Sequence, residues 1–331
     1  MGRWTRIPKG RGRFRRIYVP DPAEKARLRE LLPELYRLWA TAARRAAKKR
    51  GLPVRNLTDA VHGFLPGRSP VTCAVRHVGM NITASVDLAD CFDHVTRDKV
   101  LRALREVSLQ PPSWLDELFR DGVAAQGLPT SPMLCNIALL PVDAYMVLGL
   151  NCLPGPNAYT RYGDDIAISS SSSRQVHFAL QCLADLVRLY GFVLNEEKTR
   201  IQHASRGMRL ICGVSVGPDG IQAPRRVRRL LRAALHRGNT AQASGLAGWC
   251  ALRMPRRAAL SLAGTGLTSC SRQDPCGPNC VSGLDTLRRL RRTLDASQLA
   301  RAILMAKSTL RERPNLCPGT ALQDALHRTA P

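Results

Sequence analysis

The stretch from residue 159 to residue 169 constrains the fold more than any other part of the chain. It reads Tyr-Thr-Arg-Tyr-Gly-Asp-Asp-Ile-Ala-Ile-Ser, so two short runs suited to strands flank Gly163-Asp164-Asp165. This pattern is typical of two strands joined by a tight turn. We therefore expect a β-hairpin that carries two adjacent carboxylates at its tip. Asp is frequent in turns for local reasons, so the pair alone does not define a site.

A third carboxylate ends another expected strand. Residues 81 to 88 alternate between an apolar face and a polar face, formed by Ile82, Ala84 and Val86 and by Thr83, Ser85 and Asp87 respectively. Phosphoryl transfer to a sugar hydroxyl uses two divalent ions a few ångströms apart. Mg²⁺ prefers oxygen ligands, and carboxylates on adjacent strands hold such ligands rigidly. Asp87, Asp164 and Asp165 are therefore the candidate catalytic residues.

The net charge points to a polyanionic partner. The chain of 331 residues has 50 Lys and Arg against 25 Asp and Glu, a formal charge of +25. Self-repulsion of this size opposes compaction, and a nucleic acid would neutralise it. A basic protein without such a partner, or one drawn to anionic membranes, is the alternative. The planar guanidinium of the abundant Arg suits phosphate, which favours nucleic acid.

The cysteines and the hydropathy indicate a reducing compartment. The 11 cysteines are mostly scattered singly, many inside apolar runs, as buried thiols are. No uncharged run reaches the roughly 20 residues that cross a bilayer. We expect a cytoplasmic protein without a membrane partner.

The other elements follow from local patterns. Residues 4 to 20 predict a basic β-hairpin, and Asp21, Pro22 and Glu24 suit positions N-cap, N1 and N3 of a helix that Pro33 divides. Helices are expected over 97–120, from an N-cap at Ser131, over 175–190, from 225, over 244–265 and over 284–310. Residues 209–216 and 220–223 predict a hairpin.

Several blocks then resemble one family in order. Tyr162-Gly163-Asp164-Asp165 resembles the Tyr-x-Asp-Asp hairpin of reverse transcriptases. The blocks that match the same family are 7–20, 62–69, 87–93, 126–136 and 191–199. The resemblance implies an α+β right-hand polymerase with fingers, an antiparallel-sheet palm and a helical thumb. It assigns 1–80 and 97–125 to the fingers, 81–96 and 126–223 to the palm, and 224–265 to the thumb. Residues 266–331 form a basic extension of unknown role.

The resemblance also implies residue roles. Asp87 and Asp164, with the Leu88 carbonyl, would hold two Mg²⁺ ions, and Asp165 would support them. Lys198 would protonate or screen the leaving pyrophosphate. Phe92 would select deoxynucleotides by occupying the place of a 2′-hydroxyl. The remaining nucleotide-binding candidates are Lys9, Arg15 (with Arg16 as a competitor), Arg68, Gln126 and Gly127.

The expected partners are an RNA template and a DNA or RNA primer. A basic helix in the thumb position would grip the duplex through its phosphates. Its candidate contacts are Arg225, Arg226, Arg228, Arg229 and Arg232. A structured non-coding RNA and an effector protein are further expected partners. The sequence leaves the oligomeric state open.

Three motifs bear on the subclass of reverse transcriptase without deciding it. Cys73-Ala74-Val75-Arg76-His77 resembles the retron Asn-Ala-x-x-His and differs at its first position. Ile211-Cys212-Gly213 occupies the place of the retron Val-Thr-Gly and keeps only the Gly, whereas Cys91-Phe92-Asp93 is closer to group II intron enzymes. Retron, group II-like and defence-associated enzymes all remain open.

Other functions and sites also remain open. The same fold could add nucleotides without a template or start from a protein hydroxyl. A non-catalytic RNA-binding or maturase-like protein is a rival from another class, although it has no use for clustered carboxylates. Cys270, Cys276 and Cys280 could bind zinc, but this spacing and the missing fourth ligand favour a loop with incidental cysteines.

Overall fold

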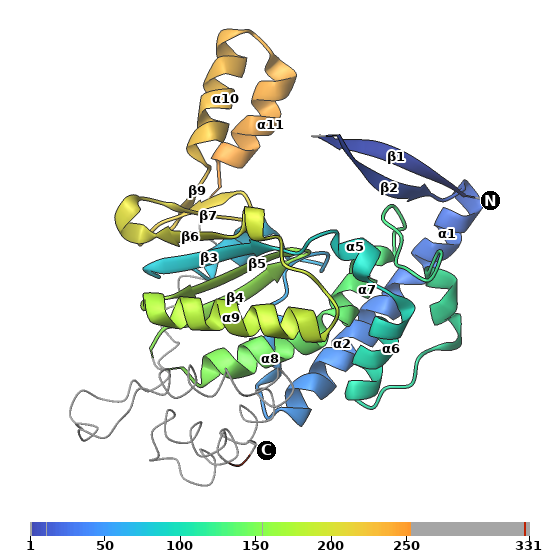
Figure 1. The fold of residues 1–331 in the computed structure, drawn as a ribbon. Helices are drawn as coiled ribbons and strands as arrows, with labels where there is room; N and C mark the ends of the chain where they lie inside the picture. The colour runs from blue at the N-terminus through green and yellow to red at the C-terminus, as the bar shows by residue number, and fades with distance from the viewer. Residues whose placement is uncertain (1, 11, 154, 253–327, 329–331) are drawn as a thin grey trace.

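The computed structural model describes residues 2–10, 12–153, 155–252 and 328 (Figure 1). The helix expected over 284–310, the end of the one expected over 244–265, and Cys270, Cys276 and Cys280 therefore lie outside the described residues.

A four-stranded antiparallel sheet lies at the centre of the molecule. Its order is β4-β5-β3-β6, formed by β4 Asn157–Tyr162, β5 Asp165–Ser170, β3 Ile82–Asp87 and β6 Arg200–His203. The alternation predicted for β3 is confirmed. Ala84 packs with Val176 on one face, and Thr83 hydrogen bonds to Ser169 on the other. The predicted hairpin over 159–169 is confirmed as β4 and β5.

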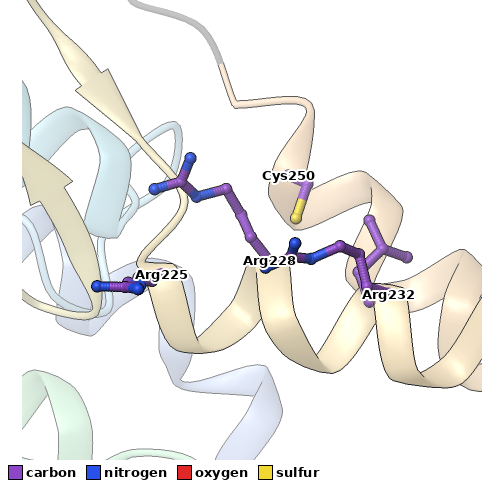
Figure 2. A pocket seen from close by; sticks show the side chains of 5 residues that line it. Arg225, Arg228, Arg232 and Cys250 are labelled. Atoms are coloured by element: carbon purple, nitrogen blue, oxygen red, sulfur yellow. The ribbon is translucent and has the colours of Figure 1, made fainter.

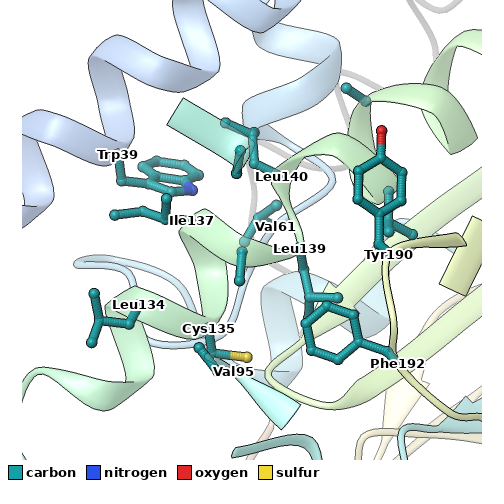
Figure 3. Packing of buried hydrophobic residues seen from close by; sticks show 14 of the residues in the cluster. Trp39, Val61, Val95, Leu134, Cys135, Ile137, Leu139, Leu140, Tyr190 and Phe192 are labelled. Carbon is teal, nitrogen blue, oxygen red and sulfur yellow. The ribbon is translucent and has the colours of Figure 1, made fainter. Parts of the chain in front are cut away.

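Helices cover one face of this sheet and form the main core. They are α2 Leu32–Lys49, α6 Arg97–Glu106, α7 Ser131–Ala138, α8 Leu140–Asn151 and α9 Ser173–Leu189. Figure 3 shows Trp39, Ile137 and Leu140 among the side chains of this core. Burial of each side chain of this kind adds roughly 1.5–3 kcal/mol to the free energy of unfolding, so these helices stabilise the covered face of the sheet.

The opposite face of the sheet carries a smaller layer. It consists of α4 Pro70–Val75 and a three-stranded sheet of β7 Arg209–Ile211, β8 Val214–Val216 and β9 Ile221–Gln222. The extended segment predicted over 209–216 is divided into two strands. Cys212 and Gly213 take positive φ values of 45° and 78°, which turn the chain between β7 and β8.

Two hairpins stand on the same side of the central sheet in Figure 1. One is the predicted basic β-hairpin, β1 Arg3–Gly10 paired with β2 Arg13–Val19, and the other is the helical pair α10 Arg225–His236 and α11 Thr240–Cys250. The Asp21 cap is confirmed, since its side chain accepts a hydrogen bond from Glu24 N at 2.9 Å. The break near Pro33 is also confirmed, because α1 Pro22–Glu30 ends just before α2 begins.

The helix predicted over 97–120 is too long. It ends at Glu106, Ser108 takes a φ of 56°, and only a 3-10 turn at Ser113–Leu118 follows Pro111 and Pro112. The left-handed Ser108 ends the helix, and Pro111 and Pro112 keep it from resuming, because Pro lacks an amide proton and disfavours a helical residue before it.

The N-cap predicted at Ser131 is also wrong. Thr130 precedes the helix, and Ser131 is its first residue. The Ser131 hydroxyl donates to Ala125 O at 2.6 Å instead of capping the helix.

The remaining short elements connect these layers. They are α3 Val54–Thr58, α5 Cys91–His94, and 3-10 turns at Glu196–Lys198 and Ala204–Arg206. Across the described residues no single helix could span a membrane; α7 and α8 pass the length and composition test only together, with a bend of 45° between them.

Candidate active site

The three candidate carboxylates come together at one end of the central sheet. Asp87 is the last residue of β3 and pairs in register with Asp165, the first residue of β5. Asp164 lies in the two-residue turn before Asp165, and its backbone carbonyl accepts a hydrogen bond from Leu88 N at 3.1 Å. The ladder between β3 and β5 therefore sets the spacing of all three carboxylates.

The surroundings of these carboxylates make their ionisation less favourable. Desolvation raises the pKa of Asp164, and the charge of Asp87 raises it further. The surrounding protein also desolvates Asp165, although this residue is partly open to solvent. Together with the charges of Asp164 and Asp87, this raises the pKa of Asp165 to about 6. Such repulsion is relieved by a cation.

Lys198 supplies one cation. Its Nζ lies 2.9 Å from Asp87 Oδ2, while 55% of the Lys198 side chain is exposed. Asn195 holds the same aspartate, since its backbone N donates to Asp87 O at 2.7 Å and its Nδ2 lies 3.4 Å from Oδ2. Lys198 thus lies against the carboxylate, and a role toward pyrophosphate requires it to turn away.

The donor chemistry of the site fits magnesium. Carboxylates and the Leu88 carbonyl are oxygen ligands, which hard divalent cations prefer. Among the described residues no group of three or more Asp, Glu, His or Cys side chains is arranged so that it could hold a metal ion as it stands. The carboxylates are gathered but not closed around a cation, consistent with Asp87 being paired to Lys198.

The β-hairpin brings basic side chains toward this cluster. Lys9 Nζ lies 2.7 Å from Oδ1 of Asp90, three residues after Asp87 in the block 87–93. The charge of Arg15 lowers the pKa of Asp164, whereas Arg16 stacks over Trp4 at 4.1 Å. Neighbouring strand residues point to opposite faces, so the structure favours Arg15 over Arg16 as the residue that faces the site.

The hairpin is attached to the loop before α7 through backbone contacts. Tyr18 N donates to Gln126 O at 2.8 Å. Gly127 has a φ of +109°, and a Cβ there would lie 2.2 Å from Tyr18 O. Gln126 and Gly127 therefore fix the hairpin, in addition to any contact with the nucleotide. Arg68, the other predicted nucleotide ligand, pairs with Asp59 at 2.9 Å.

Three aromatic rings lie close together beside the turn that carries Asp164. Phe92 is half-buried, and its ring centroid lies 6.4 Å from that of Phe64, which lies 6.4 Å from that of Tyr162. Phe64 is 37% exposed and takes a φ of 62°, unusual for an aromatic residue. Phe64 was not among the residues predicted from the sequence, although it lies in the block 62–69.

A buried polar network behind the turn was not predicted from the sequence either. Arg161 and Asp143 are fully buried and form an ion pair at 2.7 Å. Arg161 Nη1 donates to Asn136 Oδ1 at 2.9 Å and to Gly163 O at 3.0 Å. The signal available in the sequence was an arginine inside a strand that precedes the two aspartates.

Two of the departures from the retron motifs, Cys73 and Cys212, meet in space. Cys73 Sγ lies 3.7 Å from Cys212 Sγ and 3.1 Å from Thr160 Oγ1. His77 is fully buried, with its ring nitrogens 2.7 Å from Ser169 Oγ and from Thr160 Oγ1. These two replaced positions thus share one contact between α4 and the β7–β8 turn, beside strand β4.

The predicted nucleic-acid contacts lie on α10. Figure 2 shows Arg225, Arg228 and Arg232 along the helix with Cys250 of α11 beside them. These residues and Leu231 line an open hollow of about 460 Å³. Arg226 and Arg229 are exposed on the same helix. All five arginines are available to a ligand of opposite charge.

The chain is similar to known proteins over more than half of its length. Residues 19–227 match the family model described as "Reverse transcriptase (RNA-dependent DNA polymerase)". The chain is 33% identical over 251 residues to the retron Mx65 reverse transcriptase of Myxococcus xanthus, with 70% of this chain and 54% of that protein covered. The retron Mx162 reverse transcriptase of the same organism is 31% identical over 269 residues, with 70% and 51% covered. The chain thus spans about half the length of these relatives.

A telomerase structure from Candida albicans, in complex with the TWJ fragment of telomeric RNA, also overlaps with the fold. The TM-score is 0.48 at 14% identity, over 99% of this chain and 61% of that chain.

Proposed function

Because the chain belongs to the reverse transcriptase (RNA-dependent DNA polymerase) family, we propose that it copies an RNA template into DNA by adding deoxynucleotides to a primer. The observation that carries this proposal is the register of β3 and β5, which sets Asp87 opposite Asp165 beside the turn that holds Asp164. A protein that only binds RNA gains nothing from gathering three carboxylates near a polyanion.

Enzymes of this family generally use divalent metal ions. We propose that Asp87 and Asp164, with the Leu88 carbonyl, hold two Mg²⁺ ions and that Asp165 supports them. When bound, such ions activate the attacking 3′-oxygen and neutralise the leaving pyrophosphate. The protein's own part is to hold the carboxylates on adjacent strands and to release Lys198 from Asp87.

Other side chains of the site would orient the nucleotide. Lys9 and Arg15 would bind its triphosphate, helped by Arg68, Gln126 and Gly127. Phe92 would exclude a ribose 2′-hydroxyl. Lys198, once turned from Asp87, would protonate or screen the pyrophosphate.

The proposed partners are an RNA template and a primer, gripped by the arginines of α10 through phosphate contacts. The names of the two Myxococcus relatives support a retron-type role, in which a specific structured non-coding RNA is copied in the cytoplasm. An anti-phage defence role with a partner effector protein belongs to the same proposal.

The test is a double substitution, Asp164→Asn with Asp165→Asn. We expect it to abolish extension of a DNA primer on a defined RNA template. Because the substitution relieves the repulsion that raises the pKa of both groups, the melting temperature should stay equal or rise. Asp219→Asn, in an exposed turn, is the matched control and should extend primers normally.

Two results would contradict the proposal. One is primer extension by the double variant at the wild-type rate. The other is a wild-type product whose sequence is not the complement of the supplied RNA, which would indicate a polymerase that does not copy.

A further inference from the structure

A buried arginine donates a hydrogen bond to the turn that carries Asp164. Arg161 precedes Gly163 by two residues, and its Nη1 donates to the Gly163 carbonyl at 3.0 Å. That carbonyl belongs to the peptide that leads into Asp164. Moving it therefore moves Asp164 relative to Asp87, which lies on the neighbouring strand.

Asp143 of α8 keeps this arginine charged and fixed. Its carboxylate accepts from Arg161 Nε at 2.9 Å and from Nη2 at 2.7 Å, and both side chains have no exposed surface. Burial alone would lower the pKa of Arg161, but the Asp143 carboxylate raises it above its ordinary value. Tyr159 also donates to Asp143, at 2.7 Å.

Asn136 of α7 connects this arginine to a second loop, the one that contains Gly63. Its Oδ1 accepts from Arg161 Nη1 at 2.9 Å, and its Nδ2 donates to the Gly63 carbonyl at 2.9 Å. Gly63 lies directly against the turn, since a Cβ there would be 2.2 Å from Gly163 N. The carbonyls of Gly63 and Gly163 are thus held by one hydrogen-bonded pair of side chains.

The backbone reinforces the same junction. Arg161 N donates to Ala60 O at 2.7 Å, and His62 N donates to Arg161 O at 2.8 Å. The segment before Gly63 therefore runs along β4 and carries Phe64 onto the outer side of Gly163, where a Cβ on that glycine would lie 3.2 Å from the ring. Gly163 of the turn therefore lies close to both this ring and the buried guanidinium.

We propose that Arg161, Asn136 and Asp143 are positioning residues that hold the Gly163–Asp164 turn in register with Asp87, an inference that rests on the proposed function. None of them needs to touch the nucleotide. Buried ion pairs contribute little net stability in general, so the hydrogen bonds of this pair to the turn give it a role beyond stability.

The test compares Arg161→Lys with a matched control, Arg50→Lys. Arg50 is also buried and pairs with Glu106 at 3.4 Å, away from the catalytic turn. Lysine can keep each ion pair but cannot reach two further acceptors. We expect Arg161→Lys to lower kcat about 10- to 100-fold with KM for the deoxynucleotide near the wild-type value, as displacement of a reacting group does. Arg50→Lys should keep the wild-type kcat.

A second variant and a second measurement separate a loss of positioning at the turn from a general loss of folding. Asn136→Ala leaves the ion pair intact and should lower kcat in the same direction. Hydrogen exchange of residues 159–170 should become faster in Arg161→Lys and Asn136→Ala than in Arg50→Lys at equal melting temperature.

The inference is overturned if both variants keep the wild-type kcat and exchange rate, or if Arg50→Lys loses as much activity as Arg161→Lys. A wild-type protein that does not extend a primer would instead contradict the proposed function. The exchange measurement would then still report on the turn.

Discussion

At the scale of single residues, His77 is a titratable group that folding keeps neutral. Burial, followed by the charge of Arg209, lowers the pKa of His77 from 6.5 to about 3. The unfolded chain takes up a proton near its ordinary pKa, whereas the folded chain does not. The contribution of neutral His77 to the free energy of unfolding is therefore fully present above about pH 6.5. It is lost as the pH falls toward 3, by about 1.4 kcal/mol per pH unit.

We predict that His77→Gln makes the protein less sensitive to acid. The variant should unfold at a lower temperature than wild type at neutral pH, because the hydrogen bonds to Ser169 and Thr160 are disturbed. Its melting temperature should nevertheless fall less between about pH 7 and pH 5. His236→Gln, at an exposed position of α10, is the control and should follow wild type. Parallel curves for all three proteins would contradict the prediction, because they would show that the pKa of His77 does not differ between the folded and the unfolded chain.

At the scale of elements, the orientation of the β1–β2 hairpin depends on its contact with the loop before α7. Lys9 and Arg15 reach the site only if this hairpin keeps its angle, and Gly127 permits the close approach to Tyr18. A side chain at residue 127 would push the hairpin away from the body of the protein.

Gly127→Ala should therefore weaken nucleotide binding. We expect KM for the deoxynucleotide to rise roughly tenfold, equal to about 1.4 kcal/mol, in steady-state primer extension. Gly122→Ala is the matched control, since Gly122 also has a positive φ (+76°) but open space at its Cβ position. Both variants carry the strain of a left-handed alanine, about 1–2 kcal/mol. An equal KM for the two variants would mean that strain and not hairpin position determines the effect.

At the scale of the whole molecule, the charge of +25 makes salt the natural probe of nucleic-acid binding. Each phosphate contact releases counterions and steepens the dependence of Kd on salt. Figure 1 places α10 on the side of the central sheet opposite to α2. A duplex held by α10 should therefore depend on the arginines of that helix and not on the basic residues of α2.

The prediction is that Ala at Arg225, Arg228 and Arg232 lowers the slope of log Kd against log salt by about 2 to 3 for an RNA–DNA duplex. Arg37, Arg44 and Lys48 are exposed on α2, and their replacement by Ala removes the same charge. This second triple variant should leave the slope close to wild type. If both variants change the slope equally, attraction by net charge would account for binding without a specific role for α10.

Local sequence patterns predicted most of the secondary structure near the site. The alternation in β3, the tight turn at Gly163, the Asp21 cap and the break at Pro33 depend on residues a few positions apart. The helix over 97–120 was overestimated because the chain turns at the left-handed Ser108, which the apolar periodicity does not reveal. The order of the motifs was sufficient to indicate the family.

The sequence by itself thus determined most of the strands, turns and helices near the site, and which carboxylates meet, because these follow from short-range geometry and from a recognisable motif order. Only the tertiary structure decided that Arg161 is buried, with Asp143 as its partner 18 residues away, and that Cys73 meets Cys212 across 139 residues. An arginine in a strand is ordinarily expected at the surface. Its burial depends on which helices cover that face and on a partner that offsets the loss of hydration, and neither is encoded near it in the chain.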